Sequence, residues 1–303
     1  MTQVIEVRNL HKAYDGVAAV DDVSFNVDEG EIFGIIGPNG AGKTTTIESV
    51  IGLRKPDGGS VSVLGLNPQT EARKLGNRIG TQLQEAALPE RMKVWEALDL
   101  YASFYEKTVP WEPLLAQWGL AEKRNTQFGG LSGGQKQRLF ISLALLNDPQ
   151  IVFLDELTSG LDPQARRATW DLVRAIREQG KTVVLITHFM DEIEALADRV
   201  AVIDHGRVIA LDTPDNLIAS LNGETKVLFS VPRGFEAERL ENVSGVTAVH
   251  QLNQQITISG NGPLLANVAA ALAQHNIAPA DLRVQQANLE DVFLALTGRT
   301  IRN

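Results

Sequence analysis

The sequence contains no cysteine. This excludes disulfide bonds, thiolate zinc sites and cysteine nucleophiles, and it is typical of a protein in a reducing compartment. Long apolar runs are also missing: stretches such as TVVLIT (182–187) span a few residues, whereas a membrane-spanning helix needs about 20. The start, MTQVIEVRNLHK, has no basic head followed by an apolar stretch. We therefore expect neither a secretion signal nor a chain that crosses a bilayer by itself.

Positive charge is comparatively scarce, with 28 Lys and Arg against 37 Asp and Glu and a net charge of -9. Because binding to nucleic acid phosphates requires a basic face, this balance argues against a nucleic-acid partner. An apolar content of 44% is ordinary for a globular protein. The length of 303 residues allows one large domain with a small appendage.

Short apolar runs rich in β-branched residues recur between helical patterns in the first two thirds of the chain. We predict strands at Val4–Val7, Glu31–Ile36, Ile151–Leu154, Thr182–Thr187 and Val200–Ile203. Near-continuous apolar strands that alternate with helices favour an α/β core with a mostly parallel sheet buried on both faces. Residues from about 89 to 147 interrupt this alternation and are predicted to form a helical insertion.

The chain beyond residue 221 has a different order of elements. Strands are expected near residues 226–231, 247–252, 255–259 and 282–286, with helices near 236–241, 263–275 and 289–296. A βαββαβ order followed by a helix predicts a small ferredoxin-like α+β domain. We therefore divide the chain into a core domain (1–221) and a C-terminal accessory domain (222–303).

The sequence GPNGAGKT, at 37–44, matches the phosphate-loop pattern G-x-x-x-x-G-K-[ST]. A buried strand is predicted before it and a helix after it, as a loop that wraps phosphates with backbone N–H groups requires. Lys43 is expected to reach the β- and γ-phosphates and Thr44 to ligate Mg²⁺. The residues assigned to phosphate are Gly37, Pro38, Asn39, Gly40, Ala41, Gly42, Lys43, Thr44 and Thr45.

Two further strand ends carry polar side chains. IVFLDE (151–156) ends in two carboxylates: Asp155 suits the Mg²⁺ shell, and Glu156 can take a proton from the attacking water. His188 closes another strand, where it could bond a γ-phosphate oxygen and help hold the glutamate and water. The other histidines have no such setting.

The segment LSGGQ (131–135) begins a helix with two glycines, which weaken a helix. Its exposed N–H groups would form a second anion site, far from the phosphate loop in sequence. In this order and spacing, residues 37–44, LSGGQ, IVFLDE and His188 resemble the ATP-binding subunit of ABC transporters, over about residues 3–220. The resemblance implies a P-loop ABC ATPase fold with an added antiparallel β subdomain.

The resemblance also implies a head-to-tail pair of subunits, in which the LSGGQ of one closes over the ATP held by the other. Ser132, Gly133, Gly134 and Gln135 would then face the partner's nucleotide. Tyr14 matches an aromatic that stacks on adenine. Gln84 matches a glutamine that touches Mg²⁺ and senses the transmembrane partner, although Gln82 lies two residues earlier.

The segment Ser159–Asp162 matches a loop that crosses the dimer interface in the family. Asp162 precedes Pro163, so a helix N-cap is an equally good interpretation, and the two roles can coexist. Leu157 stands where the family commonly has proline. That proline shapes a loop, so we expect hydrolysis to be retained.

The family likeness predicts an ATPase that uses ATP and Mg²⁺, forms a homodimer, and works on the cytoplasmic membrane face with a separately encoded permease. The tail ANLEDVFLALTGR (287–299) resembles bacterial drug-resistance exporters, or is simply packing. Two alternatives remain: a soluble ABC-type ATPase acting on nucleic acid or ribosomes, and a non-hydrolytic ATP-binding regulatory module. The single cassette, missing cysteines and acidic balance disfavour the first, and Glu156 and His188 disfavour the second.

Overall fold

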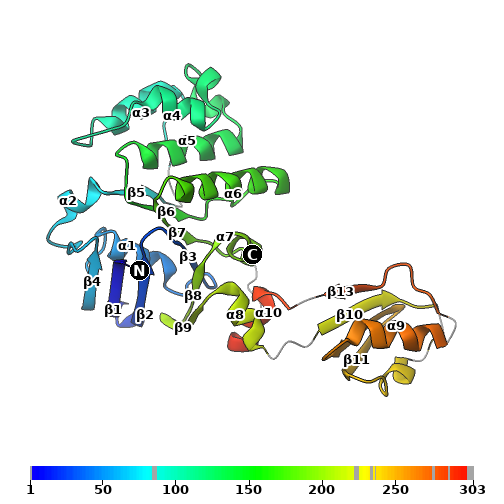
Figure 1. Cartoon of the computed structure of the whole chain (residues 1–303). Helices are drawn as coiled ribbons and strands as arrows, with labels where there is room; N and C mark the ends of the chain where they lie inside the picture. The colour runs from blue at the N-terminus through cyan, green and yellow to red at the C-terminus, as the bar shows by residue number, and fades with distance from the viewer. Residues whose placement is uncertain are drawn as a thin grey trace. The chain divides into compact units, whose positions relative to one another are not determined.

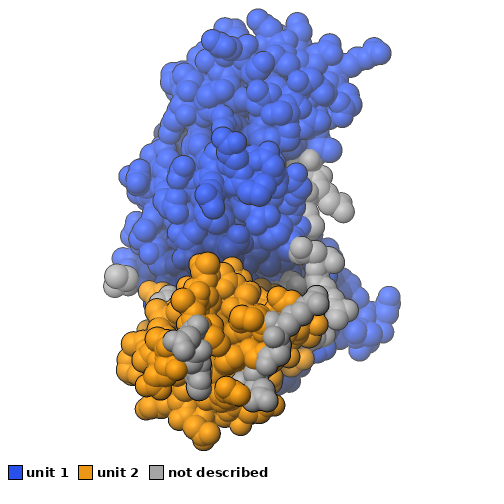
Figure 2. Space-filling view, turned by 90° about the vertical axis from the view of Figure 1, so that its right-hand side faces the viewer, with its two compact units in different colours: residues 1–214, 301–303 blue, residues 215–300 orange. Residues whose placement is uncertain are grey.

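The computed structural model describes residues 2–83, 87–221, 225–232, 235, 237–274, 277–285 and 287–298. The chain divides into two compact units, with the break between Pro214 and Asp215 (Figures 1 and 2).

The first unit is built on a six-stranded sheet in the order β5-β6-β7-β3-β8-β9. All neighbours are parallel except β8 and β9, which pair antiparallel. Every residue of β3, β6 and β7 is buried, as expected for central strands covered on both faces. The strands are β3 (Ile32–Ile36), β5 (Ile79–Gln82), β6 (Ile151–Asp155), β7 (Thr182–Ile186), β8 (Arg199–Asp204) and β9 (Arg207–Asp212).

A second, antiparallel sheet has the order β2-β1-β4. Its strands are β1 (Gln3–Tyr14), β2 (Val17–Asp28) and β4 (Gly58–Val63). Buried side chains of this sheet, such as Leu10 and Val20, share one hydrophobic core with Phe33 of β3 and Ile47 of α1 (Lys43–Val50). This shared core fixes the phosphate loop, which lies between β3 and α1, against both sheets.

A group of helices follows β5 in the chain, where the sequence predicted a helical insertion (Figure 1). Its longest helix, α5, packs against α3, α4, α6 and the strand β5, and so joins this group to the central sheet. Besides α1, the helices of this unit are α2 (Ala72–Gly76), α3 (Val94–Ala102), α4 (Trp111–Gln117), α5 (Gly133–Leu145), α6 (Pro163–Glu178) and α7 (Met190–Leu196), with 3₁₀ turns at Ala121–Lys123 and Phe128–Gly130.

The second unit has a four-stranded antiparallel sheet in the order β11-β12-β10-β13. The strand order is that of the predicted ferredoxin-like arrangement, with a helix after β12. After β10 the structure has only a short 3₁₀ turn, so the helix predicted near 236–241 is wrong. Phe229, Ile256 and Val268 are among the side chains of its separate core. Its elements are α8 (Pro214–Ser220), β10 (Thr225–Ser230), the turn Ala237–Leu240, β11 (Val246–Leu252), β12 (Gln255–Gly260), α9 (Leu264–Gln274), β13 (Arg283–Gln285) and α10 (Leu289–Thr297).

Within the described ranges, no helix is both long and apolar enough to span a bilayer.

Candidate nucleotide site

The loop between β3 and α1 needs glycine at defined positions. Gly42, the N-cap of α1, has φ +99°, and a Cβ there would lie 2.3 Å from the backbone oxygen of Ala19. Gly37 has φ +157°, and a Cβ there would lie 2.1 Å from the oxygen of Ile203. Only a residue without a side chain fits such a backbone and such close neighbours. The chain therefore holds this loop in a fixed curve over the start of α1.

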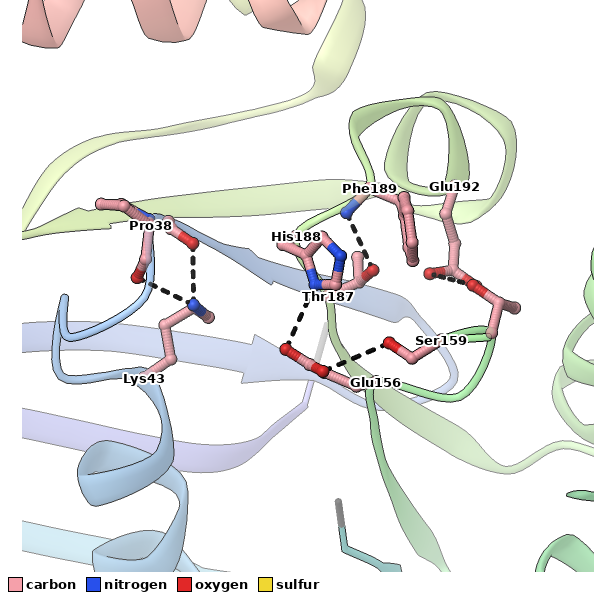
Figure 3. Close-up of polar contacts among 10 residues, drawn as sticks. Pro38, Lys43, Glu156, Ser159, Thr187, His188, Phe189 and Glu192 are labelled. Carbon is pink, nitrogen blue, oxygen red and sulfur yellow. Dashed lines mark hydrogen bonds and ion pairs between the residues drawn. The ribbon is translucent and has the colours of Figure 1, made fainter. Parts of the chain in front are cut away.

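Lys43 lies inside that curve, with only 7% of its surface exposed. Its Nζ donates hydrogen bonds to the backbone oxygens of Gly37 (2.7 Å) and Pro38 (3.0 Å) (Figure 3). Burial lowers the pKa of the Lys43 amine, and the negative charges of Glu156 and Asp155 oppose that shift. A buried cation that faces two carboxylates is positioned for a polyanionic ligand.

The two carboxylates stand at the end of β6, as the sequence predicted. Burial, helped by the nearby charge of Glu156, raises the pKa of Asp155 to about 6, while the charge of Lys43 opposes both. Glu156 has φ +48°, a left-handed conformation that is uncommon for residues other than glycine. Its backbone N–H donates to the oxygen of Ile186, at the end of β7 (2.8 Å). Such a conformation persists where the surroundings enforce it, and it occurs often at functional sites.

Glu156 and His188 meet across the ends of two neighbouring strands. His188 Nδ1 lies 3.2 Å from Glu156 Oε1, and the hydroxyl of Ser159 donates to Glu156 Oε2 at 3.2 Å (Figure 3). The side chains of His188 and Glu156 are only 17% and 12% exposed. The bond of Ser159 to the glutamate was not foreseen, because sequence analysis placed that residue only in a family loop. A carboxylate held from both sides is suited to accept a proton from a positioned water.

The residues present suit Mg²⁺ that arrives together with phosphate. Thr44 is exposed in the first turn of α1. Asp155 is the last residue of β6, which belongs to the same sheet as β3, the strand that precedes the phosphate loop. Among the described residues, no group of three or more His, Cys, Asp or Glu could hold a metal ion. Mg²⁺ commonly binds through one or two protein ligands plus substrate phosphates, which matches this donor set.

The LSGGQ segment forms the predicted helix start. Ser132 is the N-cap of α5: its hydroxyl accepts from the N–H of Gln135 (3.3 Å), and Gln135 Oε1 accepts from the N–H of Ser132 (3.0 Å). Ser132 and Gly133 are exposed. A Cβ at Gly133 would lie 3.6 Å from Leu161, and one at Gly134 would lie 4.0 Å from Ala165, which are ordinary contacts. The fold of the chain itself therefore leaves room for side chains at both glycines.

Tyr14 ends β1 and is 37% exposed. The Lys12 ammonium and the Arg54 guanidinium lie 5.5 Å and 5.2 Å from the centre of its ring. Cations over a ring face are attracted to it, so they help to hold the ring of Tyr14 in place. The contact with Arg54 was not identified from the sequence, because it joins residues 40 positions apart.

The remaining predicted residues are Asp162 and Gln84. Asp162 Oδ1 accepts from the N–H groups of Gln164 (2.9 Å) and Ala165 (2.8 Å), so the predicted N-cap of α6 is confirmed. Gln84 lies outside the described residues. Gln82, the alternative register, is a buried residue at the end of β5.

Comparison with known proteins identifies the family. The model of the ABC transporter family matches residues 20–159. The linearmycin resistance ATP-binding protein LnrL of Bacillus subtilis is 36% identical, over 99% of this chain and 100% of the relative. The Nod factor export ATP-binding protein I of Burkholderia pseudomallei is 39% identical, over 97% of each. The chain belongs to the ABC transporter family of ATP-binding subunits.

Solved structures similar to this chain belong to the same family. The structure of an ATP-binding subunit of an ABC transporter superposes with a TM-score of 0.65 at 30% identity, over 72% of this chain and 93% of the other. A dimeric ATP-binding cassette in a post-hydrolysis state, bound to ADP and Pi, gives 0.61 at 27% identity, over 69% and 98%.

These findings confirm the predicted family, its ATPase fold, its ATPase class and the likeness to exporter subunits. They also confirm ATP as the nucleotide of this family.

Proposed function

We propose that this chain hydrolyses ATP in a homodimer in which the LSGGQ of each copy completes the nucleotide site of the other. The observation that best supports this shared site is the pair of glycines at 133 and 134. They start helix α5, Gly133 exposed and Gly134 half-buried, and the chain's own packing leaves space where their side chains would be. The need for glycine therefore comes from outside the chain, and a phosphate held by a second copy meets it.

The residues of the site divide the chemistry between them. Lys43 and the N–H groups of the phosphate loop bind phosphate oxygens and neutralise charge there. Glu156 takes a proton from the attacking water, and His188 and Ser159 hold its carboxylate in place. Thr44 and Asp155, with Gln84, would hold Mg²⁺, which supplies charge neutralisation on the phosphates when it is bound. Tyr14 stacks on the adenine base.

A second part of the proposal concerns the assembly. The relatives named for linearmycin resistance and Nod factor export are ATP-binding proteins of export or resistance systems. By this likeness, the chain powers a separately encoded transmembrane permease of exporter type, as a peripheral subunit on the cytoplasmic membrane face. Co-purification of the wild-type chain with its permease from membranes tests this part.

Mixing two inactive variants tests whether the site is shared. Lys43→Ala disables the phosphate loop and Ser132→Arg disables LSGGQ. If LSGGQ acts on the partner's nucleotide, a mixed dimer keeps one intact site, made from the loop of one variant and the LSGGQ of the other. Random pairing would then restore about a quarter of wild-type turnover, because half the dimers are mixed and each has one working site.

Controls for mixing use the same proteins. Each variant alone should show no turnover, and Ser132→Arg alone should still bind ATP as a monomer. A mixture that stays as inactive as its components would mean that LSGGQ acts within its own chain, and it would overturn the shared site.

A further inference from the structure

Helix α7 begins two residues after His188 and buries a carboxyl group. Glu192 has 0% of its surface exposed and shares the buried side of the helix with Ile193 and Leu196. Because a buried carboxyl group is costly unless it is hydrogen-bonded, its partners identify what the residue does in the fold.

One partner belongs to the loop after β6. The hydroxyl of Thr158, itself fully buried, donates to Glu192 Oε2 at 3.4 Å (Figure 3). Thr158 precedes Ser159, whose hydroxyl donates to Glu156. Glu192 therefore holds the loop that in turn holds the carboxylate of Glu156.

A second buried hydroxyl near Glu192 precedes His188. The hydroxyl of Thr187, also fully buried, accepts from the N–H of Phe189 at 3.0 Å. This bond joins the residues on both sides of His188, where helix α7 begins. The ring of Phe189 also lies 4.1 Å from the His188 ring, centre to centre.

Few charges act on this carboxyl group. Burial is the largest cause that raises the pKa of Glu192, to about 7, and the hydroxyls of Thr187 and Thr158 oppose it. Asp191, on the same helix, raises it slightly, and Arg166 of α6 lowers it slightly. Arg166 itself pairs with Asp191 at 3.2 Å and lies over the ring of Phe189.

We propose that Glu192 is a positioning residue for ATP hydrolysis, which sets Glu156 and His188 relative to each other by tying the Thr158–Ser159 loop to helix α7, which begins two residues after His188. This role rests on the proposed function of the Glu156–His188 pair. The ionised carboxylate accepts from the Thr158 hydroxyl in a charge-assisted bond, which is about twice as strong as a neutral one. Hydrolysis is therefore faster when Glu192 is ionised.

The test compares Glu192→Gln with the wild-type full chain between about pH 5.5 and 8.5, as the ratio of their kcat values for ATP. An amide of the same shape copies the protonated acid, so the ratio should be near one at the acid end. At the alkaline end kcat of the variant should be about fivefold lower. The KM for ATP should not change. Taking a ratio cancels other groups that titrate in both proteins.

The free energy of unfolding provides a second measurement, in which Glu192→Gln should be at least as good as the wild type although its kcat is lower. The folded pKa of Glu192 lies above its unfolded value, so the wild type loses stability as the pH rises from about 4.5 to 7. Glu192→Gln carries no such charge. In urea unfolding it should equal or exceed the wild type at pH 8 while turning over ATP more slowly there. A residue that merely supports the fold would lose stability and turnover together.

Two further variants complete the design. Glu194→Gln makes the same chemical change at an exposed position of the same helix and should leave the kcat ratio near one at every pH. Thr158→Val removes one hydroxyl and should lower kcat at pH 8 without changing the KM for ATP. The wild type measured alongside distinguishes failure of the proposed function from failure of the positioning role. If the wild type itself does not hydrolyse ATP, the proposed function is wrong.

With an active wild type, a Glu192→Gln ratio that does not vary with pH, whatever its value, overturns the positioning role alone. An unchanged kcat in Thr158→Val would overturn it as well.

Discussion

Two helices of the first unit begin with glycine next to a proposed phosphate site, and they use glycine for different reasons. At the start of α1, Gly42 has a left-handed backbone and touches the backbone of Ala19, so the fold itself excludes a side chain. At the start of α5, Gly133 and Gly134 have ordinary helical geometry and open surroundings. The fold of the chain alone explains why residue 42 is glycine. Glycine at 133 and 134 is explained instead by the proposed contact with a phosphate held by a second copy.

This difference separates what a sequence needs in order to fold from what it needs in order to function. A side chain at Gly42 should harm both the isolated chain and its catalysis. A side chain at Gly134 should leave the isolated chain intact and harm only the shared site. Four substitutions test the contrast.

The largest effect is expected from Lys43→Ala. It removes the buried ammonium group that bonds to the backbone of the phosphate loop, and with it the charge assigned to phosphate. Turnover should fall by about 10²–10³-fold, measured as phosphate release from ATP. Near-normal release would be incompatible with the role assigned to this loop.

Gly42→Ala should destabilise the chain even without nucleotide. A left-handed alanine costs roughly 1–2 kcal/mol, and the contact with the Ala19 oxygen adds to it, so we expect a loss of about 2–3 kcal/mol. Urea unfolding of the nucleotide-free protein measures this. Gly40→Ala is a suitable control for the steric part, since Gly40 has a similar positive φ but nothing within 4 Å of its Cβ.

Gly134→Ala should have the opposite effect on stability. Alanine is the better helix former, so the free energy of unfolding should rise by about 0.5–1 kcal/mol. Turnover should nevertheless fall about tenfold, because the added methyl group would occupy space reserved for the partner's phosphate. A variant that is more stable and fully active would show that no partner phosphate requires glycine at this position.

Asp162→Ala should give the smallest change. Loss of its two bonds to Gln164 and Ala165 removes the N-cap of α6 and should cost about 1 kcal/mol in urea unfolding. Asp162→Asn, which can still cap the helix, should recover most of it. If both variants lose turnover far beyond this loss of stability, the loop also contacts the partner.

The buried parallel strands were predictable because each is a continuous apolar run. Residues 151–154 and 182–187 were assigned from the sequence and differ from β6 and β7 by one residue. The strands β1, β2 and β4 were harder to predict. They alternate between buried and exposed positions, their pairing contains register shifts, and Asn9 and Asp22 interrupt the pattern with positive φ.

The site was predictable wherever one short motif carries one role. Strand ends of a parallel sheet share an edge, so the meeting of Glu156 with His188 followed from their positions. Glu192 was missed because a lone glutamate in a short helix gives no signal in a sequence. Its importance depends on Thr158, a residue of the loop after β6, which only the folded chain brings to this carboxyl group.

The hydrogen bonds of Lys43 to Gly37 and Pro38 also bear on how quickly ATP is captured. With the ammonium group seated against these two carbonyls, the chain itself holds the loop in one curvature. An arriving triphosphate then has only to draw one flexible side chain toward itself, without having to order a disordered segment first. Entry of the nucleotide should consequently be limited by diffusion and charge, and the slow step of the cycle should lie in the meeting and parting of the two copies.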